Sequence, residues 1–175
     1  MNVPDSIPLD PKSLRRAFGA FATGVTVVTT GGTVPHAMTA NSFTSVSLDP
    51  ALVLVCVARC AVMHSCLTVT NCFGVNVLAS DQETEARHFA DRSRTLGAAQ
   101  FDHLDWLPGP LTDAPLLSGA LAHFECELWR TYDGGDHTIF LGKVLSFDHR
   151  PDRDALLVFQ SRFRQITPDR IEVTA

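Results

Sequence analysis

The sequence lacks a long apolar run and a basic block, and each absence excludes a class of protein. The longest unbroken apolar stretch, Ala51 to Ala58, ends at Arg59, and it is far shorter than the roughly 20 residues that a membrane-spanning helix requires. The formal net charge is −5, and Lys and Arg form no cluster of the kind that contacts nucleic acid. We therefore expect neither a membrane nor a nucleic acid as a partner.

The sequence also lacks a CxxC pair and any cysteine spacing typical of a zinc site. Its first residues show neither the basic start nor the apolar stretch of a signal peptide. These features predict a cytoplasmic protein, where thiols stay reduced. We expect no metal, and mostly buried cysteines that pack as small hydrophobes: Cys56, Cys60, Cys66, Cys72 and Cys126.

What is present indicates one folded domain. The chain has 175 residues, of which 45% are hydrophobic and 19% charged, a balance that excludes an intrinsically disordered chain. Typical domains run about 100–200 residues. Residues 1–10 contain two prolines and few apolar side chains, which predicts a flexible N-terminal arm ahead of a single domain at 11–175.

β-Branched and apolar runs predict a mainly β protein. The expected strands are 25–30, 34–38, 43–48, 52–58, 73–79, 121–129, 138–147 and 155–160. The expected helices are 11–24, 61–70 and 82–94, followed by a long surface excursion at 95–119. Short, mostly sequential strands favour an antiparallel barrel with a few peripheral helices over a doubly wound parallel sheet. No GxGxxG follows a strand, which excludes a Rossmann-type nicotinamide site.

Residues 38–50, MTANSFTSVSLDP, carry an unusual density of hydroxyl and amide side chains within a segment expected to form core. Such groups need hydrogen-bond partners when they are buried. Two interpretations stay open at this point. The side chains either satisfy the backbone in Asx and Ser/Thr turns, or they line a ligand site.

Two further groups of polar residues offer little acid–base chemistry. His137 follows a Gly-Gly-Asp turn at the start of an apolar strand, where it is either a structural residue or a group that meets a substrate at the barrel mouth. Asp136 and His137 have no nucleophile beside them, so a hydrolytic triad has no support. Glu125 and Glu127 share one strand face and are expected to form a solvated strip.

Four blocks together resemble a known family. They are FATGVTVVTT (21–30), MTANSFTSVSLDP with LVLVCV (38–57), FGVNVLASDQ (73–82) and GDHTIFLGKV (135–144). In this order and spacing the chain resembles the flavin reductase component of two-component flavin-dependent monooxygenases, a short-chain family with the FMN-binding split barrel. The resemblance covers about residues 12–166. It implies an antiparallel split β-barrel, and it favours the ligand-lining interpretation of residues 38–50.

The resemblance implies an NAD(P)H:flavin oxidoreductase that works as a homodimer. Such an enzyme reduces FAD or FMN by hydride transfer from NADH, the expected donor, or NADPH, and the reduced flavin diffuses to a partner monooxygenase. Hydride transfer between two stacked rings requires positioning, because the cofactor carries the chemistry. Two alternatives stay open: a flavin carrier on the same fold without reductase activity, and a flavin oxidase resembling the pyridoxamine phosphate oxidases.

The resemblance also implies site residues. The segment that bonds the ribityl chain and ring edge matches Thr39, Ala40, Asn41 and Ser42. The segment beside the isoalloxazine matches Ser45, Val46 and Ser47, and the turn at the phosphate end matches Val57, Ala58, Arg59 and Cys60. Phe89 and Phe101 match positions where the family often has aromatic or apolar residues in the flavin pocket. A basic residue of the closing C-terminal segment matches Arg164, and the histidine that positions the nicotinamide, without acting as acid or base, matches His137.

One departure from the family pattern lies in the turn before His64. Relatives commonly have Ser-Ala-Ser there, whereas this chain has Arg59, Cys60, Ala61, Val62 and Met63. The hydroxyls that would meet the flavin phosphate are missing, which leaves backbone N–H groups and Arg59 for that task. The preference between FMN and FAD therefore stays open.

Overall fold

The computed structural model describes residues 9–166. The expected flexible arm at residues 1–10 lies almost wholly outside the described residues, as does the C-terminal end of the expected domain at 11–175. Within 9–166, no helix is long and apolar enough to cross a membrane.

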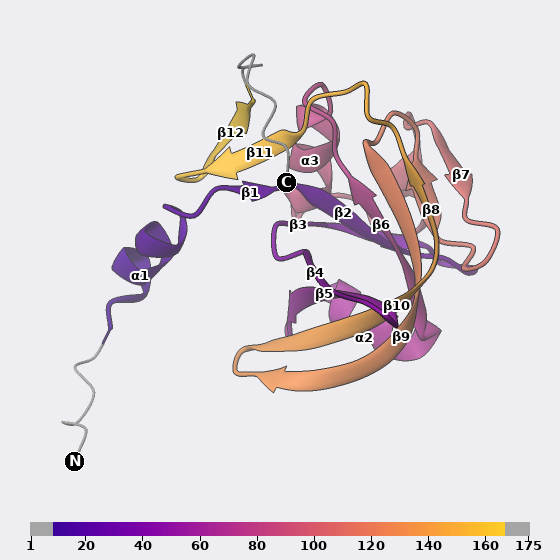
Figure 1. The fold of residues 1–175 in the computed structure, drawn as a ribbon, viewed down its shortest axis with the longest axis horizontal. Helices are drawn as coiled ribbons and strands as arrows, with labels where there is room; N and C mark the ends of the chain where they lie inside the picture. Colours follow the sequence, from indigo (N-terminus) through magenta and orange to yellow (C-terminus); the bar gives the residue numbers. More distant parts are fainter. Residues whose placement is uncertain (1–8, 167–175) are drawn as a thin grey trace.

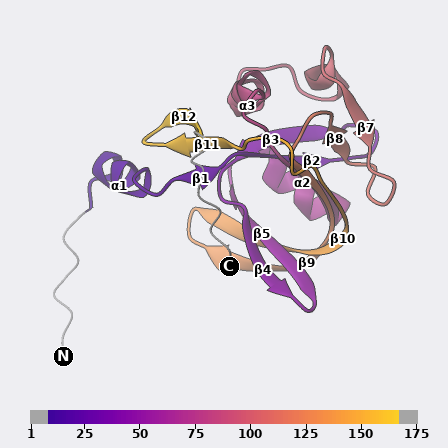
Figure 2. The same ribbon diagram turned by 45° about the horizontal axis from the view of Figure 1, so that its top comes forward.

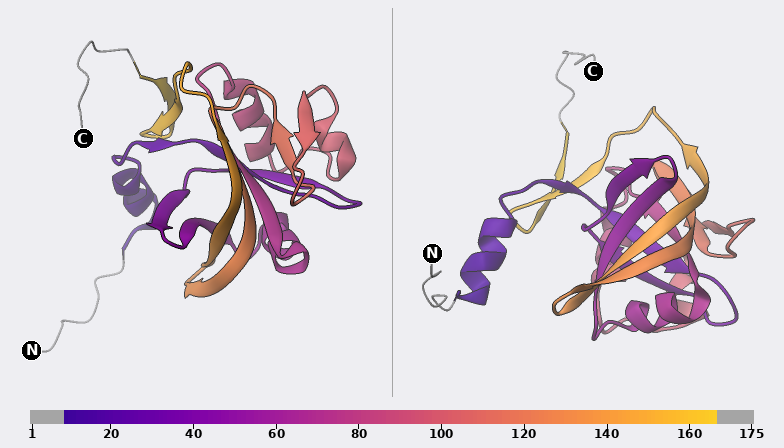
Figure 3. Two further views of the ribbon diagram at one scale, coloured as in Figure 1. Left: turned by 45° about the vertical axis from the view of Figure 1, so that its right-hand side comes forward. Right: turned by 60° about the horizontal axis from the view of Figure 1, so that its bottom comes forward.

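The main sheet has seven strands in the order β3-β2-β6-β9-β10-β5-β4, and every neighbouring pair is antiparallel. The strands are β2 (Thr26–Thr30), β3 (His36–Ala40), β4 (Thr44–Leu48), β5 (Ala51–Ala58), β6 (Cys72–Val77), β9 (Ala122–Gly134) and β10 (His137–His149). The sheet curls on itself, as the right panel of Figure 3 shows. The end strands β3 and β4 do not pair with each other, so the barrel is split. The predicted antiparallel split β-barrel is confirmed.

Smaller elements cover the barrel. A second sheet joins β1 (Thr23–Gly24), β11 (Leu156–Phe159) and β12 (Arg162–Gln165), and a third joins β7 (Trp106–Pro108) and β8 (Pro115–Leu117). The helices are α1 (Pro11–Phe18), α2 (Val62–Thr70), α3 (Glu83–Ala90) and the 3₁₀ turn η1 (Ala98–Phe101). In Figures 1 and 2, α1 lies apart from the barrel, and none of its side chains is buried.

Two predicted helices end earlier than expected. The one predicted at 11–24 ends at Phe18, and the one predicted at 82–94 ends at Ala90. Asp91 is extended, and its carboxylate accepts hydrogen bonds from the N–H and the hydroxyl of Ser93. Such a local side-chain turn competes with helix continuation. Residues 92–96 are therefore a loop.

Successive buried residues of β2 divide the core into two clusters, because side chains alternate across a strand. Val28 packs with Phe73, Phe140 and Met63 between the sheet and α2. Val27 packs in a second cluster beneath α3, η1 and β8, with Leu78, Phe89, Phe101, Leu117 and Leu156. Each such side chain contributes about 1.5–3 kcal/mol by leaving water. This packing holds α2 and α3 in fixed positions on the barrel.

The expected solvated strip on β9 is wrong for one of its two carboxylates. Glu125 is only 2% exposed, because residues 109–114 fold across it and donate hydrogen bonds to it. Glu127 is half-exposed and pairs with Lys143 at 3.0 Å. Strand alternation correctly placed both carboxylates on one face of β9. It did not show that the loop at residues 109–114 covers the part of this face that carries Glu125.

The cysteines are all free. Cys126 is buried, Cys60 is exposed, and the other three are partly buried. The described residues contain no group of three or more His, Cys, Asp or Glu side chains placed to hold a metal ion.

Candidate functional site

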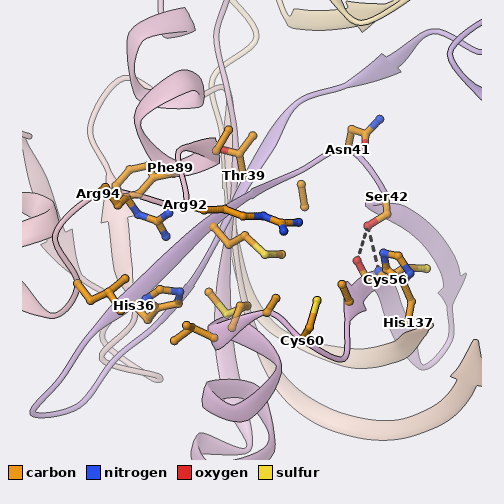
Figure 4. Close-up of a pocket in the computed structure, with 18 residues that line it drawn as sticks. His36, Thr39, Asn41, Ser42, Cys56, Cys60, Phe89, Arg92, Arg94 and His137 are labelled. Carbon is orange, nitrogen blue, oxygen red and sulfur yellow. Dashed lines mark hydrogen bonds between the residues drawn. The ribbon is translucent and has the colours of Figure 1, made fainter. Parts of the chain in front are cut away.

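A cleft of about 490 Å³ opens beside the split in the barrel. One wall is β3 with the two residues that follow it, and the floor is the end of β5 with the start of α2. The end of α3 and the loop after it, which are bonded to β3, extend this wall, and His137 closes one end. Figure 4 shows this arrangement. The volume is in the range of small-molecule and cofactor sites, roughly 300–1,000 Å³.

The polar residues after β3 both satisfy the backbone and line the cleft. The Ser42 hydroxyl donates to the carbonyl of Cys56 and accepts from its N–H, each at 3.0 Å. The Thr39 hydroxyl donates to the carbonyl of Ala86 at 2.7 Å. These bonds join the wall to β5 and α3. Asn41 donates only to Thr23, at 3.3 Å, and its exposed amide keeps acceptor capacity for a ligand.

Eight of the site residues expected from the resemblance line the cleft. They are Thr39, Ala40, Asn41, Ser42, Ala58, Cys60, Phe89 and His137. They come from β3, β5, α3, β10 and the turns that follow β3 and β5, so the fold brings together residues that lie far apart in the sequence, between 39 and 137.

The other expected residues lie outside the cleft of this single chain. Ser45, Val46 and Ser47 are on the edge strand β4. Val57 points into the core, because it alternates with Ala58. Phe101 packs behind the wall against Phe89, with ring centroids 5.5 Å apart. Arg164 is exposed on β12.

Arg59, expected at the phosphate end, is also held elsewhere. Its Nε donates to the carbonyl of Gly135 at 3.0 Å, and its Nη2 pairs with Asp133 at 3.2 Å. The guanidinium therefore fastens the tip of the β9–β10 hairpin and does not line the cleft.

Sequence reasoning missed several cleft residues: His36, Met38, Arg92, Arg94 and Leu96. Both arginines fell inside the helix predicted at 82–94, where their direction was undefined. The Asp91-x-Ser93 pattern was the available signal, because Asx turns favour helix ends.

The cleft is electropositive although the chain is acidic. Within residues 9–166, no Asp or Glu lines it, whereas Arg92 and Arg94 do. His36 adds no charge at neutral pH, because burial, reinforced by Arg94, lowers its pKa to about 4. The start of α2 also faces the cleft, and its N-cap Ala61 supplies no side-chain hydrogen bond. Free N–H groups at a helix start and arginines favour phosphate, so these residues fit a flavin phosphate.

Neighbouring residues fix His137 and the floor of the cleft. His137 Nδ1 lies 2.8 Å from the Asp136 carboxylate, and this hydrogen bond lowers the pKa of Asp136. His64 Nε2 lies 2.9 Å from the hydroxyl of Thr138. The second contact joins α2 to β10, so the floor and the end of the cleft keep a fixed spacing.

Known proteins with the same sequence pattern and fold are flavin reductases. The NADH-dependent FAD reductase of Streptomyces globisporus is 56% identical over 165 residues, which are 94% of this chain and 91% of that protein. The solved structure of the NADH:FAD oxidoreductase from that organism, in complex with NAD and FAD fragments, matches at 53% identity with a TM-score of 0.88, covering 95% of this chain and 100% of the other.

A bacterial halogenase system provides a further match. The flavin reductase component of a bacterial two-component tryptophan halogenase is 56% identical, with a TM-score of 0.88 over 92% of this chain and 100% of that one. The family model for the flavin reductase-like domain matches residues 18–167. The split barrel, its electropositive cleft and these matches agree: the chain belongs to the flavin reductase-like domain family.

Proposed function

We propose that this chain is an NADH-dependent flavin reductase that reduces FAD or FMN and supplies the reduced flavin to a separate flavin-dependent monooxygenase or halogenase component. The observation that carries this proposal is the electropositive cleft, with an apolar floor, polar edges and His137 at one end. The reductase activities of the similar proteins support it.

A bound flavin supplies the hydride acceptor, and the protein's residues bind and orient it. Asn41 and the neighbouring backbone would offer hydrogen bonds to the edge of a flat ring, and Ala58 would offer an apolar contact on the floor of the cleft. His137, held by Asp136, positions the nicotinamide. No proton needs to be abstracted from either ring for a hydride to pass between them. This agrees with a cleft whose described lining residues include no carboxylate.

The decisive experiment is a steady-state assay that crosses FAD, FMN and riboflavin with NADH and NADPH. The proposal expects flavin-dependent oxidation of NADH. Absence of turnover with every combination would contradict it. Tight flavin binding in that case would instead identify the protein as a flavin carrier, and reduction of bound FMN by a pyridoxamine-type substrate would identify an oxidase.

We further propose that the enzyme is a homodimer that buries β4 and the adjoining face of the β9–β10 hairpin. β4 is an edge strand with unpaired backbone groups on one side, and edge strands of this kind favour pairing with another chain. Large apolar side chains are exposed on these strands: Val46, Leu48, Trp129, Tyr132, Leu145 and Phe147. Exposed large apolar side chains mark interaction surfaces where they form a contiguous patch. Such an interface would also place Ser45 and Ser47 between subunits.

A further inference from the structure

Arg92 is a cation in the cleft without a protein partner. Among residues 9–166, its guanidinium has no hydrogen bond and no ion pair, whereas Arg94, which also lines the cleft, donates to the carbonyls of Asp91 and Ala37. Figure 4 shows its side chain reaching into the middle of the cleft, between a group with His36 and Phe89 and a group with Ser42 and His137. This position leaves its donors available to a ligand.

The loop that carries Arg92 is held in place on both sides of it. The Asp91 carboxylate accepts two bonds from Ser93, at 2.8 and 2.7 Å. Arg94 donates to the carbonyl of Asp91 at 2.6 Å and also to the carbonyl of Ala37 on β3. These contacts connect residues within the loop and fasten the loop to β3. A fixed loop reduces the entropy that Arg92 loses on binding a ligand.

The charge around Arg92 is suited to a diphosphate. In the part of the chain that the structure describes, no acidic side chain lines the cleft to compete for its guanidinium. The uncapped start of α2 lies on the floor, and Arg92 extends from the loop after α3, so two separate anion-binding features face one cleft. A diphosphate carries an anionic group for each of these features, whereas a mononucleotide carries only one phosphate. Arginine also binds phosphate oxygens through two parallel N–H groups.

We infer that Arg92 binds the diphosphate of an adenine dinucleotide in this cleft and thereby selects dinucleotides over mononucleotides. The inference rests on the proposed function, in which FAD and NADH are the two dinucleotides that carry this group. Beyond Arg92, Leu96 and Met38 provide an apolar end for a flat base beside neutral His36.

The first test is equilibrium binding without turnover. Flavin fluorescence titrations measure the Kd values for FAD, FMN and riboflavin with the wild-type protein, Arg92→Ala, Arg92→Lys and the control Arg150→Ala. Arg150 is exposed outside the cleft and lies 3.8 Å from Asp148. We expect Arg92→Ala to raise the Kd for FAD by about tenfold or more and the Kd for FMN by less than about threefold. The Kd for riboflavin should not change. Arg92→Lys should give an intermediate Kd for FAD, because lysine keeps the positive charge but lacks the two parallel N–H groups of the guanidinium.

The second test concerns the nicotinamide. With riboflavin as acceptor, the KM values for NADH and for reduced nicotinamide mononucleotide are compared between the wild type and Arg92→Ala. If Arg92→Ala raises the Kd for FAD more than that for FMN, the diphosphate that Arg92 binds belongs to the flavin. If the variant raises the KM for NADH more than that for the mononucleotide, the diphosphate belongs to the nicotinamide dinucleotide. The inference is overturned if Arg92→Ala weakens binding of neither FAD nor NADH. It is also overturned if the variant weakens binding of each mononucleotide as much as that of the matching dinucleotide. Wild-type turnover in the same assay tests the proposed function separately.

Discussion

The side chains of Glu125 and Thr112 meet in a hydrogen bond of 2.8 Å between Oε2 and the hydroxyl. The same carboxylate oxygen accepts the N–H groups of Leu111 and Thr112 at 2.9 Å, and Oε1 accepts the Ser146 hydroxyl at 2.8 Å. One buried carboxylate thus fastens residues 109–114 to both long strands of the barrel.

This arrangement predicts a loss of stability in acid. Burial raises the pKa of Glu125, but the hydrogen bonds outweigh burial, and the pKa lies below the ordinary value of 4.5. A folded-state pKa below the unfolded value stabilises the fold above the unfolded pKa, and this stabilisation is lost as the pH falls through the folded pKa. Urea denaturation should therefore show a free energy of unfolding that falls below pH 4.5.

Glu125→Gln should reduce this acid dependence and cost about 1–3 kcal/mol at neutral pH, because the amide cannot accept all four hydrogen bonds. Glu127→Gln is the matched control on the same strand face, and it should change stability by no more than about 0.5 kcal/mol. If the free energy of unfolding falls equally with decreasing pH in the wild type and in Glu125→Gln, groups other than Glu125 cause the loss of stability in acid.

The backbone packing at Gly31 predicts a position that accepts no side chain. A Cβ there would run into the carbonyl of Asp113 and would lie 2.9 Å from the amide nitrogen of Ala114. Gly31→Ala should cost about 1–3 kcal/mol, because backbone atoms must move. Gly24→Ala is the control, since a Cβ there meets nothing within 4 Å. Thermal unfolding of both variants checks the prediction, and equal Tm values would contradict it.

The position of His137 predicts a selective effect on the nicotinamide. His137→Ala should raise the KM for NADH by about tenfold, the equivalent of one charge-assisted hydrogen bond, and should raise the KM for the flavin less. Asp136→Asn should act in the same direction but more weakly, because Asp136 only orients the ring. Steady-state kinetics at saturating flavin give the comparison. An unchanged KM for NADH in His137→Ala would remove this residue from the site.

The exposed apolar face predicts a variant that separates the subunits. Leu48, on β4, is 96% exposed, and a charge at this position opposes burial in an interface. Leu48→Glu should shift the molar mass in light scattering from dimer to monomer at micromolar concentration. Leu107→Glu, on β7 and 70% exposed, should leave the mass unchanged. A wild-type monomer, or a Leu48→Glu dimer, would contradict the proposed homodimer.

The strands could be predicted because their residues carry the signal themselves. The β-branched run before Gly31 and the apolar runs at 52–58 and 73–79 became β2, β5 and β6. Polar density at Thr39 and Ser42 left two interpretations open, and only the resemblance to the flavin reductases favoured a ligand-lining wall. Arg92 and the cover over Glu125 could not be predicted in this way, because both depend on loops whose direction is set by contacts with distant residues.

The opposite charges of the cleft and of the chain as a whole have a consequence for encounter rates. A net charge of −5 repels polyanions too large to enter the cleft, while Arg92 and Arg94 attract a small anion that approaches its mouth. Added salt screens both fields. Capture of a dinucleotide should therefore slow as ionic strength rises, whereas capture of neutral riboflavin should not, and the protein discriminates among anions by size before any specific contact forms.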